Sequence, residues 1–170
     1  VTAIRYDGET GRGVVVEVGP DRKYRGRRVV VTVSTGVLAA ERIAFHPELP
    51  KSKWAAIRGL PMGLLNKVVF QFDGDVFAKE GNSAWVLSQR PASREGNKPE
   101  VMAFVIKPLG ANIAVGFYGA EQARRFETLG DAAAIEYAKA ALADMYGSAV
   151  VSRIQDKATK VTKWGQNPWT

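Results

Sequence analysis

The sequence predicts an α+β fold, a mixed and mainly antiparallel sheet flanked by helices. Short segments rich in β-branched residues recur along the chain, separated by glycine, asparagine, proline and charged residues, as in antiparallel sheets. After position 130 the hydrophobic period changes to three or four residues, which is typical of a helix. With 170 residues, 46% of them hydrophobic, the chain is long enough to enclose a core.

A strand pair and a short helix are the first expected elements. Gly13–Val18 and Arg27–Val33 are β-branched runs with a Gly-Pro-Asp turn sequence between them, so we predict that they pair. Residues 50–59 begin with proline and end with glycine. Trp54 and Ile57 lie three residues apart within this segment, which predicts a helix of two turns.

The middle of the chain predicts an antiparallel sheet. Its four expected strands are Asn66–Phe72, Ser83–Ser88, Val101–Ile106 and Asn112–Phe117. The polar segment Arg90–Pro99 lies between the second and third of these strands. Its composition predicts a surface loop.

The last third predicts one long helix followed by strands. Asp131 is the expected N-cap, and Gly147 ends the run. Between them, hydrophobic residues recur at helical spacing at Ile135, Ala138, Leu142 and Met145. Val150–Ile154 and Lys160–Trp164 return to a composition that predicts strands.

Composition excludes several kinds of chemistry. The chain has no cysteine and one histidine, His46, so disulfides, thiol nucleophiles and multi-histidine or cysteine metal sites are excluded. No glycine-rich phosphate loop and no Ser-His-Asp set is present. The most apolar runs, Val29–Val33 and Ala132–Ala143, are too short or too interrupted by charge to span a bilayer. We therefore expect a soluble domain without a metal; the absence of cysteine fits cytosol and periplasm alike.

Lys67 is the residue that most deserves a chemical interpretation. It opens the apolar run Lys67–Phe72, where partial burial would let its ammonium position a water through donated hydrogen bonds. The alternative is a lysine whose stem packs on the strand while its charged end stays in water. Spacing alone favours this second interpretation.

Several motifs, in order along the chain, resemble the flavin-containing amine oxidases, a family that includes monoamine oxidases, polyamine oxidases and lysine-specific histone demethylases. The resemblance extends over essentially the whole chain, although each motif alone is loose. The matching segments are VVVTVSTGVL at 29–38, IAFHPELP at 43–50, residues 53–67, GFYGA at 116–120, residues 142–147 and VTKWGQNPW at 161–169.

The resemblance implies a cofactor, FAD, and a set of site residues. The lysine that matches Lys67 holds a water against the flavin and takes part in its reoxidation by oxygen, so Lys67 becomes the expected catalytic residue. Trp164 matches a tryptophan that packs near the flavin ring. Val1 resembles the valine at the adenine end of the cofactor, and Thr32 and Ser34 lie in the turn on the cofactor side, where the family often has proline in place of Ser34.

The same resemblance implies how the chain is organised. Residues 1–36 would belong to, or adjoin, the FAD-binding domain, and residues 37–170 would form a substrate-binding domain truncated at its C-terminal end. The family's main FAD-binding motifs are absent from these 170 residues. We therefore expect the central, substrate-binding part of an FAD-dependent amine or amino-acid oxidase, with the missing FAD-binding half as its partner and with little activity of its own.

The net charge leaves one alternative open. With 24 Lys and Arg against 17 Asp and Glu, the chain carries a formal charge of +7. Five of these cations cluster at Arg22, Lys23, Arg25, Arg27 and Arg28. They would suit a non-catalytic module that binds polyanions or nucleic acid. No nucleic-acid-binding motif accompanies them, so we expect a small amine or amino acid as the ligand and no nucleic acid.

Overall fold

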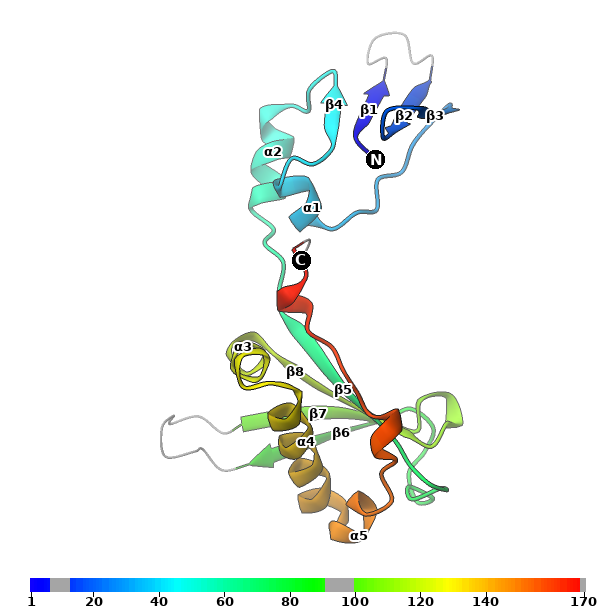
Figure 1. Cartoon of the computed structure of the whole chain (residues 1–170), viewed down its shortest axis with the longest axis vertical. Coiled ribbons are helices and arrows are strands. Elements are labelled where there is room, and N and C mark those ends of the chain that lie inside the picture. Colours follow the sequence, from blue (N-terminus) through cyan, green and yellow to red (C-terminus); the bar gives the residue numbers. More distant parts are fainter. Residues whose placement is uncertain (7–12, 91–99, 169–170) are drawn as a thin grey trace. The chain divides into compact units, whose positions relative to one another are not determined.

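The computed structural model describes residues 1–6, 13–90 and 100–168. It divides into two compact units, Val1–Gly63 with Pro168, and Leu64–Asn167 (Figure 1). Each unit is described by itself. The assignment of residues 1–36 and 37–170 to cofactor-binding and substrate-binding parts remains a prediction.

The first unit contains a four-stranded sheet in the order β3-β2-β1-β4. The strands are β1 (Ala3–Tyr6), β2 (Val14–Val18), β3 (Arg22–Gly26) and β4 (Ala44–His46). Strands β1, β2 and β3 pair antiparallel, whereas β4 pairs parallel with β1. Ala3, Ile4 and Ile43 are the buried apolar residues at this sheet.

The predicted partner of the first strand was wrong. The chain turns back after Val18, so that Arg22 pairs with Val18 and β3 takes up the edge of β2. The β-branched run that follows therefore has no neighbouring strand within the described residues and forms no strand itself. Strand propensity needs a pairing partner to become structure.

Two helices complete the first unit. Helix α1 (Thr35–Ala39) occupies a position where the resemblance implied a turn, and the Val37 amide donates a hydrogen bond to the Ser34 hydroxyl at 3.2 Å. Helix α2 (Lys51–Arg58) confirms the helix expected after Pro50, and Gly59 is its C-cap. Ile57 is its buried residue.

The second unit is a five-stranded antiparallel sheet in the order β6-β7-β8-β5-β9. Its strands are β5 (Leu65–Gln71), β6 (Ala84–Arg90), β7 (Glu100–Ile106), β8 (Ile113–Gly119) and β9 (Lys160–Val161). The first four confirm the strands predicted for the middle of the chain. The predicted loop at Arg90–Pro99 lies, from residue 91 onward, outside the described residues.

Helices α3 (Ala120–Leu129) and α4 (Asp131–Tyr146) cover one face of this sheet (Figure 1). Helix α4 is the predicted helix, although Gly130 takes the N-cap position and Asp131 is the first helical residue. Its buried residues are mostly alanines, whose small side chains let the helix lie close to the sheet. Ala123 and Phe126 are the buried residues of α3.

Two predictions near the C-terminus were wrong in part. Val150–Ile154 is not a strand: α5 (Ser148–Val151) is a short helix that packs beside α4, and Ile154 forms only an isolated bridge with Phe72. The expected strand Lys160–Trp164 is confirmed only at β9, after which Trp164 begins a 3-10 turn, Trp164–Gln166. The 3-10 turns Pro108–Gly110 and Asp156–Ala158 complete the elements. None of the helices in the described ranges is long and apolar enough to cross a membrane.

Candidate functional site

Lys67 lies near the start of β5, on the face of the sheet opposite the helices. The burial pattern of β5 alternates: Asn66, Val68 and Phe70 are buried, whereas Lys67 and Val69 between them are half-buried. Because successive side chains of a strand point to opposite faces, Lys67 and Val69 belong to the face that α3 and α4 leave open. We call this surface the open face.

Aromatic side chains lie beside Lys67 on the open face. Lys67 pairs with Phe117 across β5 and β8, and its Nζ lies 5.6 Å from the centre of the Phe117 ring. Trp85 on β6 stacks on the Phe117 ring, with the two ring centres 5.4 Å apart. The distance from Nζ to Phe117 lies within the range of a cation–π contact.

The open face is mainly apolar and accessible, with Lys160 of β9 as a second cation opposite Val69. Beside Lys67 and the two aromatic residues it includes Leu65, Val69, Leu87, Val101, Ala103, Val105 and Val115, as the strand register requires. Trp85 and Leu87 are 68% and 70% exposed. Contiguous exposed apolar surface of this kind marks a binding surface more often than an ordinary solvated face.

The backbone of Trp164 lies at the same end of β5 as Lys67. The Lys67 amide donates to the Thr162 hydroxyl at 2.8 Å, and the Thr162 amide donates to the Lys67 carbonyl at 2.9 Å. The Trp164 amide donates to the Asn66 side-chain oxygen at 2.8 Å, and the Trp164 side chain is 43% exposed. The structure thus places the backbones of Lys67 and Trp164, two predicted site residues far apart in the sequence, at one end of β5, with the Trp164 amide held from the helix-covered face.

The other predicted cofactor residues lie in the first unit. Val1 is exposed and precedes β1; Thr32 is exposed in the extended segment before α1. Ser34 caps α1 through its hydroxyl. Their contact with a cofactor remains a prediction.

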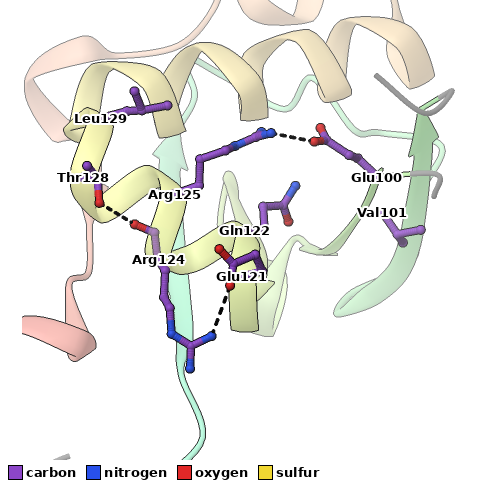
Figure 2. Close-up of a pocket in the computed structure, with 8 residues that line it drawn as sticks. All are labelled: Glu100, Val101, Glu121, Gln122, Arg124, Arg125, Thr128 and Leu129. Atoms are coloured by element: carbon purple, nitrogen blue, oxygen red, sulfur yellow. Dashed lines mark hydrogen bonds and ion pairs between the residues drawn. The ribbon is translucent and has the colours of Figure 1, made fainter. Parts of the chain in front are cut away.

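A separate hollow of about 610 Å³ lies between α3 and the start of β7 (Figure 2). Its charged groups are already paired within it, Arg125 with Glu100 at 2.8 Å and Arg124 with Glu121 at 3.5 Å. Neither Lys67 nor Trp164 lines it. In the described ranges, no three acidic or histidine side chains gather as a group that could hold a metal ion.

The buried phenol of Tyr118 lies on the helix-covered face, across from Asn66. Burial raises its pKa to about 12, and the negative charges of Asp131 and Glu127 act in the same direction. Tyr118 is therefore a neutral group near pH 7, and it is not suited to act as a base.

Comparison with known proteins identifies the family. A family model described as "Flavin containing amine oxidoreductase" matches residues 1–170. The chain belongs to this family.

Curated relatives with similar sequences include plant histone demethylase homologues. The chain is 30% identical over 175 residues to lysine-specific histone demethylase 1 homolog 1 of Arabidopsis thaliana, covering 100% of this chain and 19% of the relative. It is 29% identical over 170 residues to homolog 2 of the same plant, covering 99% of this chain and 22% of the relative. It therefore spans about a fifth of the length of these relatives.

Solved structures share the fold. Cyclohexylamine oxidase from Brevibacterium oxydans aligns with a TM-score of 0.64 at 20% identity, covering 98% of this chain and 34% of that one. A putrescine oxidase bound to putrescine aligns with a TM-score of 0.68 at 17% identity, covering 99% and 34%. These alignments confirm the predicted α+β class.

Sequence reasoning missed the surroundings of Lys67. It named neither Phe117 nor Trp85 as neighbours, and it gave no role to Asn66 or Glu127. The alternation of β5 and β8 held a usable signal, because Lys67 and Phe117 share a face once the two strands are paired in register.

Proposed function

We propose that this chain is the substrate-binding central part of an FAD-dependent amine or amino-acid oxidase, with Lys67 as its catalytic residue. One observation carries the proposal: the Lys67 ammonium lies beside Phe117 on an accessible apolar face, at the strand end that also holds Trp164. The family membership supports a flavin as the cofactor.

The residues present fit a planar aromatic cofactor. A half-exposed indole, an accessible and mainly apolar sheet face and the Lys67 ammonium offer flat contact surface and a strong hydrogen-bond donor. When bound, the flavin would accept a hydride from the amine C–H and return electrons to oxygen, giving hydrogen peroxide. Lys67 would hold a water through donated hydrogen bonds and stabilise negative charge that develops near its ammonium.

The open face also bears on the substrate. Phe117, Trp85 and Leu87 would pack against the carbon skeleton of an amine, because they are apolar and accessible. A net charge of +7 does not favour attraction of polyamines, so small amines or amino acids are the substrates we propose. The names of similar proteins suggest which amines to screen first: methylated histone lysine, cyclohexylamine and putrescine.

The test removes the Lys67 ammonium in the flavin-loaded enzyme that contains this chain. We expect Lys67→Met to slow reoxidation of the reduced flavin by oxygen on the order of 100-fold, measured by stopped-flow absorbance. Lys79→Met is the matched control, because Lys79 is exposed in the connection beyond the far end of β5. Equal reoxidation rates in both variants and the wild type would remove Lys67 from the mechanism.

A second test concerns the chain alone. Because the family's main cofactor-binding motifs are absent from it, we expect the purified 170-residue chain to bind FAD weakly and to show no oxidase activity. Equilibrium dialysis with FAD measures this directly. A yellow chain that keeps its flavin through gel filtration would contradict it.

The alternative function, a basic module for polyanions, has one supporting observation. Every residue of β3 is exposed, including Arg22, Lys23 and Arg25, and β3 lies at the edge of its sheet. Retention of the chain on immobilised duplex DNA, followed against salt concentration, tests it. We expect no retention near physiological salt; retention that Arg22→Ala and Arg25→Ala together abolish would favour this alternative.

A further inference from the structure

A buried polar residue directly precedes Lys67. Asn66 has none of its surface exposed and lies on the helix-covered face, among apolar core residues. Burial of an amide side chain costs free energy unless its polar atoms are hydrogen-bonded, so its partners indicate its purpose.

Both polar atoms of the Asn66 side chain have partners from other parts of the chain. The amide nitrogen donates to Oε1 of Glu127, on α3, at 2.7 Å. The amide oxygen accepts the Trp164 backbone N–H at 2.8 Å and the Thr162 hydroxyl at 3.4 Å. Asn66 thus links α3, β5 and the Trp164 segment at one point.

Glu127 holds the next residue of the same segment. Its Oε1 accepts the Gly165 backbone N–H at 2.8 Å, in addition to the bond from Asn66. Hydrogen bonds to an ionised carboxylate are stronger than bonds between neutral groups. Gly165 permits the approach, because a Cβ at that position would fall on the Glu127 carboxylate.

Regular sheet pairing ends before the chain reaches Trp164. Strand β9 pairs with β5 at two positions only, and the 3-10 turn that contains Trp164 is three residues long. At this point Asn66 and Glu127 accept hydrogen bonds from two successive backbone amides, those of Trp164 and Gly165.

We propose that Asn66 and Glu127 form a clamp that fixes Trp164 relative to Lys67. They act as positioning residues: they are hydrogen-bonded to each other and accept hydrogen bonds from the amides of Trp164 and Gly165. The inference rests on the proposed function, because the clamp would keep Trp164 and Lys67 in the positions in which they face the flavin. A displacement of about 1 Å in such an arrangement is enough to slow a reaction substantially.

Three variants of helix α3 test the clamp. Glu127→Ala removes both accepted hydrogen bonds. Glu127→Gln keeps an acceptor oxygen that can take both, so it should restore what the alanine variant loses. Glu121→Ala is the matched control, because Glu121 lies on the same helix, is exposed and forms an ion pair with Arg124 of that helix.

The first readout is amide hydrogen exchange in the labelled 170-residue chain, followed by NMR. In Glu127→Ala we expect exchange at Gly165 and Trp164 to accelerate at least tenfold, with the amides of β5 and β8 as protected as in the wild type. The Gln variant and the Glu121 control should match the wild type. Unchanged exchange at Gly165 in Glu127→Ala would overturn the clamp.

The second readout is reoxidation of the flavin in the loaded enzyme. We expect Glu127→Ala to slow it about tenfold and Glu127→Gln to stay within twofold of the wild type. If Lys67→Met slows reoxidation and Glu127→Ala does not, the clamp has no positioning role and the proposed function stands. If Lys67→Met has no effect, the proposed function fails, while hydrogen exchange still decides whether the clamp exists.

A second variant protects the test against misfolding of Glu127→Ala. Gly165→Ala leaves the carboxylate in the chain but places a methyl group where it now lies. We expect the same acceleration of exchange at Trp164 and the same slowing of reoxidation. Wild-type behaviour in both measurements would overturn the inference.

Discussion

The two faces of the five-stranded sheet differ in what covers them, although the same strands build both. On the helix-covered face, Val68, Phe70 and Phe104 are fully buried against α3 and α4. On the open face, Lys67 and Val69 are half-buried, and Trp85 is mostly exposed. Neighbouring residues of one strand thus belong to very different environments.

This contrast shows that strands can carry apolar residues on both faces although the helices of this unit cover only one of them. The run Val68-Val69-Phe70 does not alternate between apolar and polar residues, which is typical of strands covered on both faces. Within the described residues of this unit, the helices cover one face. An apolar open face is what a cofactor-binding part and a substrate would be expected to cover, in line with the proposed function.

The largest expected difference between the faces concerns stability. Phe104→Ala should lower the free energy of unfolding by about 3–5 kcal/mol, because Phe104 is fully buried and its removal leaves a cavity. Trp85→Ala should cost about 1 kcal/mol or less, since it loses mainly its stacking on Phe117. Urea unfolding of the two variants measures both; equal losses would mean that the open face is covered in solution.

A smaller difference comes from adding a single methyl group. In Gly116→Ala the new Cβ would lie 2.6 Å from Met102 Cε and 2.8 Å from Phe104 Cε1, so the tightly packed face must shift. We expect a loss of about 1–3 kcal/mol. Gly81→Ala is the control, because nothing lies within 4 Å of its added Cβ. A neutral Gly116→Ala in urea unfolding would show that the covered face is loosely packed.

The smallest effect we predict appears only at alkaline pH. The pKa of Tyr118 is about 12 in the folded chain against an ordinary value of 10.0, because of burial and the charges of Asp131 and Glu127. The unfolded chain therefore loses this proton first as pH rises. Stability from the neutral phenol is complete below pH 10 and is lost between pH 10 and 12.

Tyr118→Phe should therefore flatten the fall in melting temperature between pH 10 and 12. Some dependence should remain, because burial and Glu80 raise the pKa of Tyr146 to about 12 as well. Thermal melts at pH 9, 10, 11 and 12 check this. An identical slope in Tyr118→Phe and the wild type would indicate that water reaches the phenol on the covered face.

Local sequence signals predicted much of the second unit and less of the first. Turn-forming residues marked β5 to β8, and α4 showed its helical period with glycine at its end. Helix α3 was missed because only Ala123 and Phe126 are buried on it, which leaves a narrow apolar stripe in a polar sequence. The prediction that Arg27–Val33 pairs with Gly13–Val18 failed because strand propensity does not determine which of two neighbouring segments pairs with β2.

The sequence by itself determined the α+β class, the strands of the central sheet and the family resemblance that singled out Lys67 and Trp164. It also determined the side-chain alternation that puts Lys67 and Val68 on opposite faces of the sheet. Only the tertiary structure decided which face the helices cover and that Asn66, Glu127 and Trp164 meet. Asn66 is separated from Glu127 by 61 residues and from Trp164 by 98. Local patterns record neighbours along the chain, whereas hydrogen bonds between distant residues exist only once strand register and helix packing are set.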